Sequence, residues 1–184
     1  MTVVFLIEER SMQEALKGLL PKILPGETCI LVPHAGKQDL EKSIQRKLRA
    51  WRDPKVRFVV VHDQDSADCY LLKNRLQGLC RKAGRENCLV RIACRELESW
   101  FLGDLEAVES GMALNGIARL QEKRRFRDPD RLGNPEEELR KLVPSYQQIS
   151  GARAIGPLLN PEKNKSRSFQ VFVAGLRNMM SNHR

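Results

Sequence analysis

Short runs of apolar residues alternate along the chain with longer stretches in which apolar residues recur at helical spacing. The runs TVVFLI, TCILV, RFVVV and CLVRIA are typical of strands that are buried on both faces of a sheet. The stretch from Lys37 to Trp51 shows the other pattern, because Leu40, Ile44 and Leu48 would share one face of a helix. Further helices are predicted from Ser11 and over 66–82, 96–110 and 168–180.

The order of these elements predicts an α/β fold. Strands that alternate with helices form a Rossmann-like, mainly parallel sheet, here of about four strands, with helices on both faces. The pattern changes after about residue 110, where proline and glycine recur and charges crowd together, as in EKRRFRDPDR. We therefore expect an α/β core over 1–110 and a basic, loop-rich, mostly helical C-terminal extension over 111–184 that packs on the core.

Acidic residues follow three of the predicted strands, at the point where each strand ends. Because the carboxyl ends of parallel strands meet at one edge of a sheet, these acids should converge there. Neighbouring carboxylates disfavour each other's ionisation, and a Mg²⁺ or Mn²⁺ ion with its preference for oxygen ligands would relieve that repulsion. The alternative is that Asp65 only caps the next helix and Asp63 lies in a turn. The acids concerned are Glu8, Glu9, Asp63, Asp65, Glu96 and Glu98.

The chain carries a net charge of +9, which favours a polyanionic partner such as nucleic acid. Lysine and arginine neutralise phosphates without reading sequence, although a run of charge is more often a solvated face. The basic candidates for nucleic-acid contact are Arg124, Arg125, Arg153, Lys165 and Arg167.

Several classes of protein fit the sequence poorly. No apolar run approaches the roughly 18 residues of a membrane span, and the first residues lack the pattern of a signal peptide. The five cysteines are an odd number without a CxxC pair, which argues against a disulfide framework or a structural zinc site. We therefore expect a cytoplasmic protein with reduced thiols.

A strand that ends in glutamate and enters a helix, followed by a later strand that ends in Asp-x-Asp, resembles the Toprim domain of topoisomerases, primases and OLD-family nucleases. Glu8-Glu9-Arg10-Ser11-Met12 aligns with that family's Glu-Gly-x-Ser-Asp motif, and Glu9 and Met12 depart from it. The segments VVHDQDSADC, RIACRELESWFLGD and ISGARAI with NKSRSF resemble a bacterial family numbered 4276 among domains of unknown function. This second resemblance covers nearly the whole chain.

The resemblance implies roles for the acids. Glu8, or Glu9 in its place, would be the general acid/base or a metal ligand, and Asp63 and Asp65 would bind Mg²⁺. Glu96 and Glu98 would be further metal ligands, so that two ions could act in phosphodiester hydrolysis. The implied protein is a nuclease acting on DNA or RNA, with phage defence as its setting and an ATPase encoded nearby as a partner.

An alternative of another class is a non-catalytic Toprim-like subunit that binds nucleic acid or an ATPase, and the departures at Glu9 and Met12 favour it. His62 would be a base or a structural histidine, and strand alternation directs it away from Asp63. At helical spacing, Trp100 and Phe101 indicate core residues rather than a base-stacking platform.

Overall fold

The four predicted strands form a single parallel sheet in the order β2-β1-β3-β4. In the computed structural model, which describes residues 1–181, the strands are β1 (Thr2–Ile7), β2 (Thr28–Pro33), β3 (Arg57–Asp63) and β4 (Leu89–Ala93). From β1 the chain forms β2 on one side of β1 within the sheet, and it then forms β3 on the other side of β1. The carboxyl ends of β1 and β3 therefore flank a topological switch point, where ligands of open parallel sheets bind. The predicted α/β fold class is confirmed.

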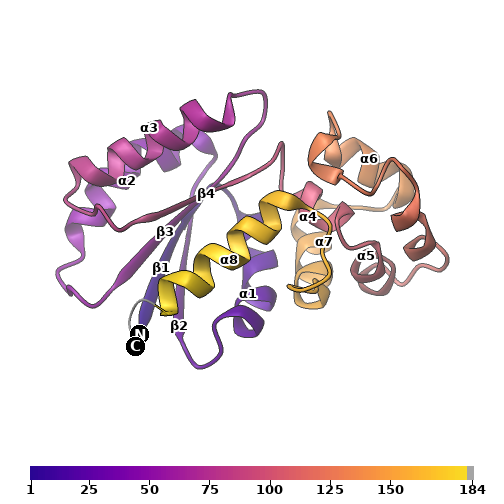
Figure 1. Cartoon of the computed structure of the whole chain (residues 1–184), viewed down its shortest axis with the longest axis horizontal. Coiled ribbons are helices and arrows are strands. Elements are labelled where there is room, and N and C mark those ends of the chain that lie inside the picture. Colours follow the sequence, from indigo (N-terminus) through magenta and orange to yellow (C-terminus); the bar gives the residue numbers. More distant parts are fainter. Residues whose placement is uncertain (182–184) are drawn as a thin grey trace.

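Helices cover both faces of this sheet (Figure 1). One face carries α2 (Lys37–Ala50) and α3 (Cys69–Lys82), and the other carries α1 (Arg10–Ile23) and α8 (Arg167–Ser181). Successive residues of one strand serve opposite faces, so that Leu6 packs under the first pair of helices and Phe5 under the second. Burial on both sides explains why the strands read as unbroken apolar runs.

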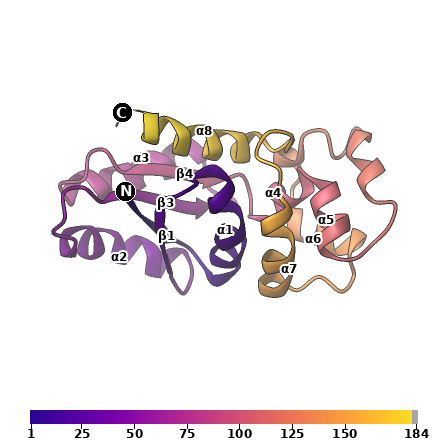
Figure 2. The ribbon, with the colours of Figure 1, turned by 90° about the horizontal axis from the view of Figure 1, so that it is seen from below.

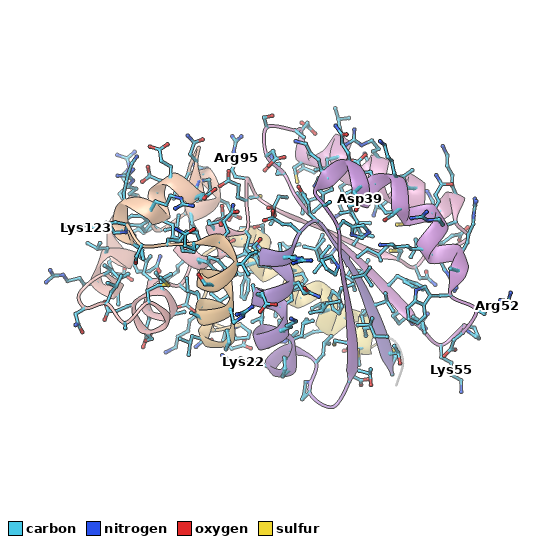
Figure 3. The ribbon with its side chains drawn as sticks, turned by 180° about the vertical axis from the view of Figure 1, so that it is seen from behind. Lys22, Asp39, Arg52, Lys55, Arg95 and Lys123 are labelled. Atoms are coloured by element: carbon cyan, nitrogen blue, oxygen red, sulfur yellow. The ribbon has the colours of Figure 1, made fainter. Side chains whose placement is uncertain are left out.

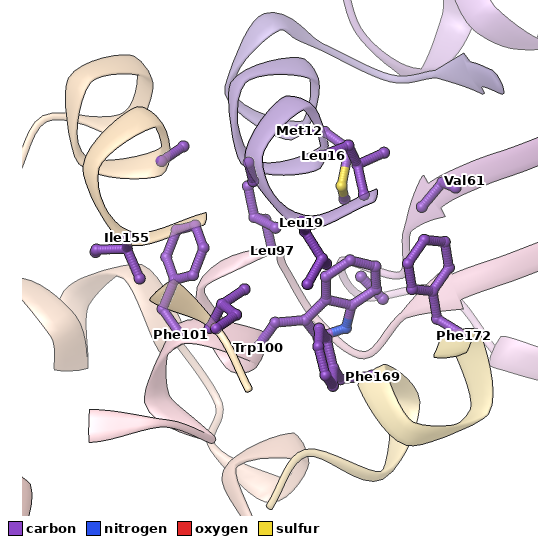
Figure 4. Packing of buried hydrophobic residues seen from close by; sticks show 14 of the residues in the cluster. Met12, Leu16, Leu19, Val61, Leu97, Trp100, Phe101, Ile155, Phe169 and Phe172 are labelled. Atoms are coloured by element: carbon purple, nitrogen blue, oxygen red, sulfur yellow. The ribbon is translucent and has the colours of Figure 1, made fainter. Parts of the chain in front are cut away.

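The remaining helices gather on the side of the sheet toward which the strands run (Figure 2). Their aromatic side chains continue the core of the α1 face: Trp100 and Phe101 are fully buried, and Trp100 packs on Phe169 and Phe172 of α8 (Figure 4). Trp100 and Phe101 are therefore core residues, as predicted. The elements of this part are α4 (Glu98–Leu102), α5 (Leu105–Gly111), α6 (Pro135–Leu142), α7 (Gln148–Ile155) and the 3₁₀ helices η1 (Ala118–Glu122), η2 (Pro129–Arg131) and η3 (Gly156–Leu158).

A polar network fastens the start of α8 to the end of β4. Asp130 accepts hydrogen bonds from the Ser168 N–H and the Ser166 hydroxyl, both at 2.6 Å. Ser168 Oγ in turn accepts the Cys94 N–H and the Trp100 indole N–H, both at 3.1 Å. This network ties α8 to the end of β4. The predicted boundary between an α/β core and a C-terminal extension at residue 110 stays a prediction.

Three helix boundaries differ from those predicted. The helix expected over 96–110 is broken, because Gly103 lies against Asn164 and Asp104 caps a new helix by accepting the Ala107 N–H at 3.2 Å. The helix expected from Ser66 begins at Cys69, since Asp68 caps it through the Leu71 N–H at 2.9 Å. The first helix begins at Arg10, so that Ser11 lies inside it and its hydroxyl donates to the Glu9 carboxylate.

Among residues 1–181, no helix is long and apolar enough to cross a membrane. The five cysteines, all of which lie in this range, are free thiols.

Candidate functional site

Carboxylates meet at the switch point between β1 and β3. Glu8 is the first residue after β1, and Asp63 is the last residue of β3. The pairing of Ile7 with Val61 brings these strand ends side by side, and the Asp63 N–H donates to Glu8 Oε2 at 3.1 Å. The sheet register alone therefore places Glu8 and Asp63 at one point.

Asp63 is buried, with an exposed fraction of 8%, and its Oδ1 has no hydrogen-bond partner. Burial raises the pKa of Asp63 well above its ordinary value, and the charges of Glu8, Glu98 and Glu9 raise it further. An unpaired buried oxygen among like charges is unfavourable unless something positive binds it. Protonation of Asp63 or a bound cation would relieve this repulsion.

Glu8 is held from two sides. Burial raises its pKa, while the nearby His62 ring acts in the opposite direction. His62 Nδ1 lies 3.1 Å from Glu8 Oε2 and 2.5 Å from the Asp63 carbonyl oxygen. Because a carbonyl oxygen only accepts, this nitrogen carries a proton that it donates to Asp63. His62 Nε2 faces Glu41 Oε1 at 3.5 Å. His62 is a buried histidine that lies against Glu8, and the choice between a base and a structural histidine stays a prediction.

Asp65 lies in a strained turn above Asp63. Asp65 and Arg95 have φ values of 51° and 59°, a left-handed conformation that residues other than glycine rarely adopt. The two are joined, because the Asp65 N–H donates to the Arg95 carbonyl oxygen at 2.8 Å. Since Asp68 caps α3 and Asp63 belongs to β3, the structure contradicts the alternative in which Asp65 is the cap and Asp63 lies in a turn.

Glu98 and Glu96 face the same group from the start of the helical part. Glu98 is 3% exposed and accepts the Tyr146 hydroxyl at 2.8 Å, and burial raises its pKa to about 7. Glu96 is half-buried and accepts the Glu136 N–H at 3.0 Å, and burial raises its pKa as well. Glu98 therefore lies in the protein interior, whereas Glu96 is half-buried against the start of α6.

The donor set fits a magnesium-type ion held in part by water and phosphate. Among the described residues, no group of three or more His, Cys, Asp or Glu side chains is arranged closely enough to enclose a metal ion. Mg²⁺ usually takes only one or two carboxylates from the protein and keeps water or substrate phosphate as its other ligands. The unpaired Asp63 Oδ1 and the nearby Asp65 carboxylate supply ligands of that kind.

A cleft of about 590 Å³ lies beside Glu9, between the starts of α1 and α7 and the loop after β2, and none of the other candidate acids lines it. Glu9 and Arg10 form one wall, Gly36 the second, and Gln148 and Ile149 the third. A nucleotide is of a size that such a cleft accommodates.

Two of the five basic candidates are paired with acids, and the other three are exposed. Arg153 Nε pairs with Glu14 Oε2 at 2.6 Å, and Arg125 pairs with Glu138. Lys165 and Arg167 are exposed on either side of the buried Ser166, at the start of α8, and Arg124 is exposed in the loop after η1. Figure 3 shows neighbouring Lys123 at the outer end of the helical part, far from Arg95 at the junction with the sheet.

His34, in the loop after β2, has a structural role. Its Nδ1 lies 2.7 Å from the Ile7 carbonyl oxygen and its Nε2 lies 2.6 Å from the Ser43 hydroxyl. Burial lowers the pKa of this histidine.

Sequence reasoning missed Lys37 and Tyr146, which both touch the acids. Lys37 Nζ lies 2.8 Å from Asp65 Oδ2, and Tyr146 holds Glu98. No motif marks either residue, and their contacts join positions 28 and 48 residues apart in the chain.

The sequence matches the family described as "Domain of unknown function (DUF4276)" over residues 7–177. The chain belongs to this family. No curated protein matches the sequence. The match over residues 7–177 confirms the predicted membership of family 4276 for nearly the whole length of the chain.

Two solved structures share the fold. The C-terminal region of the Burkholderia pseudomallei OLD protein aligns with a TM-score of 0.52 and 16% identity, over 96% of this chain and 97% of that one. The C-terminal region of the Xanthomonas campestris pv. campestris OLD protein aligns with a TM-score of 0.51 and 13% identity, over 100% of this chain and 98% of that one. At these identities the likeness is one of fold, and it agrees with the predicted relation to OLD proteins.

Proposed function

We propose that this DUF4276 protein is a Mg²⁺- or Mn²⁺-dependent nuclease that hydrolyses phosphodiester bonds of DNA or RNA. The observation that carries the proposal is the buried Asp63 carboxylate, with its unpaired Oδ1 among the charges of Glu8, Glu9, Asp65 and Glu98. A divalent ion would remove this repulsion, and a phosphate substrate would complete the ion's ligands. The OLD-like fold supports a Toprim-type domain, and the chemistry rests on the residues.

Asp63 and Asp65 would hold the ion, with Glu8 beside them. The ion would neutralise the scissile phosphate and lower the pKa of an attacking water. Glu8 lies 3.1 Å from His62 Nδ1 and accepts the Asp63 N–H, and the direction of its pKa shift, upward through burial, suits a general acid/base. Glu8 is a better candidate for this role than Glu9, whose carboxylate accepts the Ser11 hydroxyl.

The two further acids would differ in role. Glu98 is enclosed and bonded to Tyr146, which suits a residue that supports Asp63 rather than a direct ligand. Glu96 is only half-buried and would be the candidate ligand of a second ion.

Nucleic acid would reach the acids along the exposed basic residues. Arg124, Lys165 and Arg167 would contact phosphates, while Arg153 and Arg125 would contribute less because Glu14 and Glu138 already neutralise them. A cytoplasmic location, an ATPase partner and a role in phage defence are further parts of the proposal that rest on the family resemblance.

The test is cleavage of plasmid DNA, single-stranded DNA and tRNA by purified protein in Mg²⁺, Mn²⁺ or EDTA. Asp63→Asn should abolish cutting, since it removes one charge from the ion's ligands. The matched control is Asp68→Asn in the same loop, because asparagine also caps helices and this variant should cut normally. Retained cutting by a folded Asp63→Asn protein would defeat the assignment.

The alternative is a non-catalytic subunit that binds nucleic acid. Two observations favour it: the described residues form no ready metal cage, and the Lys37 ammonium already neutralises Asp65. This alternative predicts salt-sensitive binding without cleavage in any metal, and binding that survives Asp63→Asn. Metal-dependent cutting by the wild-type protein alone would exclude it.

A further inference from the structure

Lys37 places a positive charge inside the group of acids. It is the first residue of α2, and its Nζ lies 2.8 Å from Asp65 Oδ2. The hydrogen bond and charge of Asp65 raise the pKa of Lys37, and the charges of Glu8 and Glu41 add to the effect. The ammonium is therefore within electrostatic reach of carboxylates from β1, the β3–α3 loop and α2 itself.

The two aspartates of the Asp-x-Asp pair differ in what they offer a ligand. Asp63 Oδ1 is buried and has no hydrogen-bond partner. Asp65 Oδ2 is partly exposed and is already neutralised by Lys37. Asp65 Oδ2 therefore already has a positively charged partner, whereas Asp63 Oδ1 has none.

We infer that Lys37 is a resident counter-cation of the acidic site, and that a divalent metal ion must displace it from Asp65 in order to bind. This inference rests on the proposed metal-dependent function, and it concerns how the metal enters. It makes Lys37 a competitor of the metal rather than a ligand or a reacting group.

Electrostatic repulsion between the ammonium and the ion favours the competition. A Mg²⁺ ion would approach Asp65 to about 2.1 Å, and an ammonium that hydrogen-bonds to the same carboxylate would then lie close to a doubly charged ion. The side chain of Lys37 is 55% exposed, and its four-carbon stem is flexible, so that the ammonium can turn toward solvent without moving α2.

The inference predicts that Lys37→Gln binds metal more tightly than the wild-type protein. Removing the competing charge and its repulsion of the ion should lower the Kd for Mn²⁺ by about two- to fivefold, the range expected for a partly exposed ion pair. Lys37→Arg keeps the charge and should bind Mn²⁺ as the wild-type protein does.

The measurement is Mn²⁺ binding, followed by the loss of the electron paramagnetic resonance signal of free Mn²⁺, so that no catalysis is needed. The matched control is Lys42→Gln, which removes one exposed lysine from the same helix and should change the Kd less than twofold. Circular dichroism verifies that each variant is folded.

The outcomes separate this inference from the proposed function. Tighter binding by Lys37→Gln, but not by Lys42→Gln or Lys37→Arg, supports it. Equal or weaker binding by folded Lys37→Gln overturns the inference and leaves the metal site standing. Failure of both the wild-type protein and Lys37→Gln to bind Mn²⁺ overturns the metal site and the inference with it.

Discussion

Replacing Asp63 with asparagine should stabilise the metal-free protein while it removes activity. The Asp63 side chain is 8% exposed, its Oδ1 lacks a partner, and its neighbours Glu8 and Glu98 are also acids. Asparagine has the same shape and no charge, and its amide can donate to these carboxylates. A buried acceptor left unsatisfied costs about 1–3 kcal/mol, and for a chain of this size that range corresponds to about 3–10 °C in melting temperature.

The dependence on pH follows from the direction of the pKa shift. The pKa of Asp63 is raised in the folded protein above its ordinary value of 3.8, so that folding favours the protonated form. The contribution of this carboxyl to stability is present below pH 3.8 and is lost as the pH rises through the folded pKa. The advantage of Asp63→Asn should therefore be absent near pH 3.5 and should grow toward pH 8.

The assay is thermal unfolding, followed by circular dichroism in EDTA at several pH values and repeated with Mn²⁺. Mn²⁺ should raise the melting temperature of the wild-type protein and leave that of Asp63→Asn nearly unchanged. The control is Asp130→Asn, which should destabilise, because the Asp130 carboxylate accepts the Ser168 N–H and the Ser166 hydroxyl. If both variants lower the melting temperature alike at pH 8, Asp63 is not an unfavourable buried charge and the reasoning fails.

Two further predictions concern stability. Glu98→Gln keeps an acceptor for the Tyr146 hydroxyl and removes the charge. Between pH 4.5 and about 7, the free energy of unfolding of the wild-type protein should therefore fall by about 2–3 kcal/mol relative to that of the variant. Urea unfolding measures this, and parallel pH profiles of the two proteins would contradict it. Gly156→Ala would put a Cβ 2.5 Å from a backbone oxygen of α1 and should destabilise by about 2 kcal/mol or more, whereas Gly78→Ala, in open space on α3, should stabilise by about 0.5–1 kcal/mol. Equal unfolding midpoints for these two glycine variants would count against the close contact of η3 with α1.

The fold is largely predictable from the sequence because its main signals are local. Each strand is a short apolar run, and each long helix has apolar residues at helical spacing, so that a parallel sheet with two covered faces follows. The errors occur where tertiary contacts decide. The helix over 96–110 is broken because Gly103 meets Asn164, a residue that belongs to a distant loop.

The acids were predictable for a similar reason, since strand ends of a parallel sheet share one edge. Their partners were not, because they depend on packing between segments far apart in sequence. Arg153 illustrates this: it is a basic candidate for nucleic-acid contact, but its guanidinium pairs with Glu14, 139 residues earlier. A charge in a sequence does not reveal whether another charge already neutralises it.

The C-terminal helices are part of the candidate site rather than an attachment to it. Tyr146 and Glu136 come from this part of the chain, and they hold Glu98 and Glu96 against the sheet edge. By enclosing Glu98 they also help to exclude water from the side of Asp63 that faces the interior, and this desolvation is the main reason that both pKa values are raised. The raised pKa values of the acids at the strand ends are therefore produced jointly by the sheet, which aligns the acids, and by the helical part, which keeps them from water.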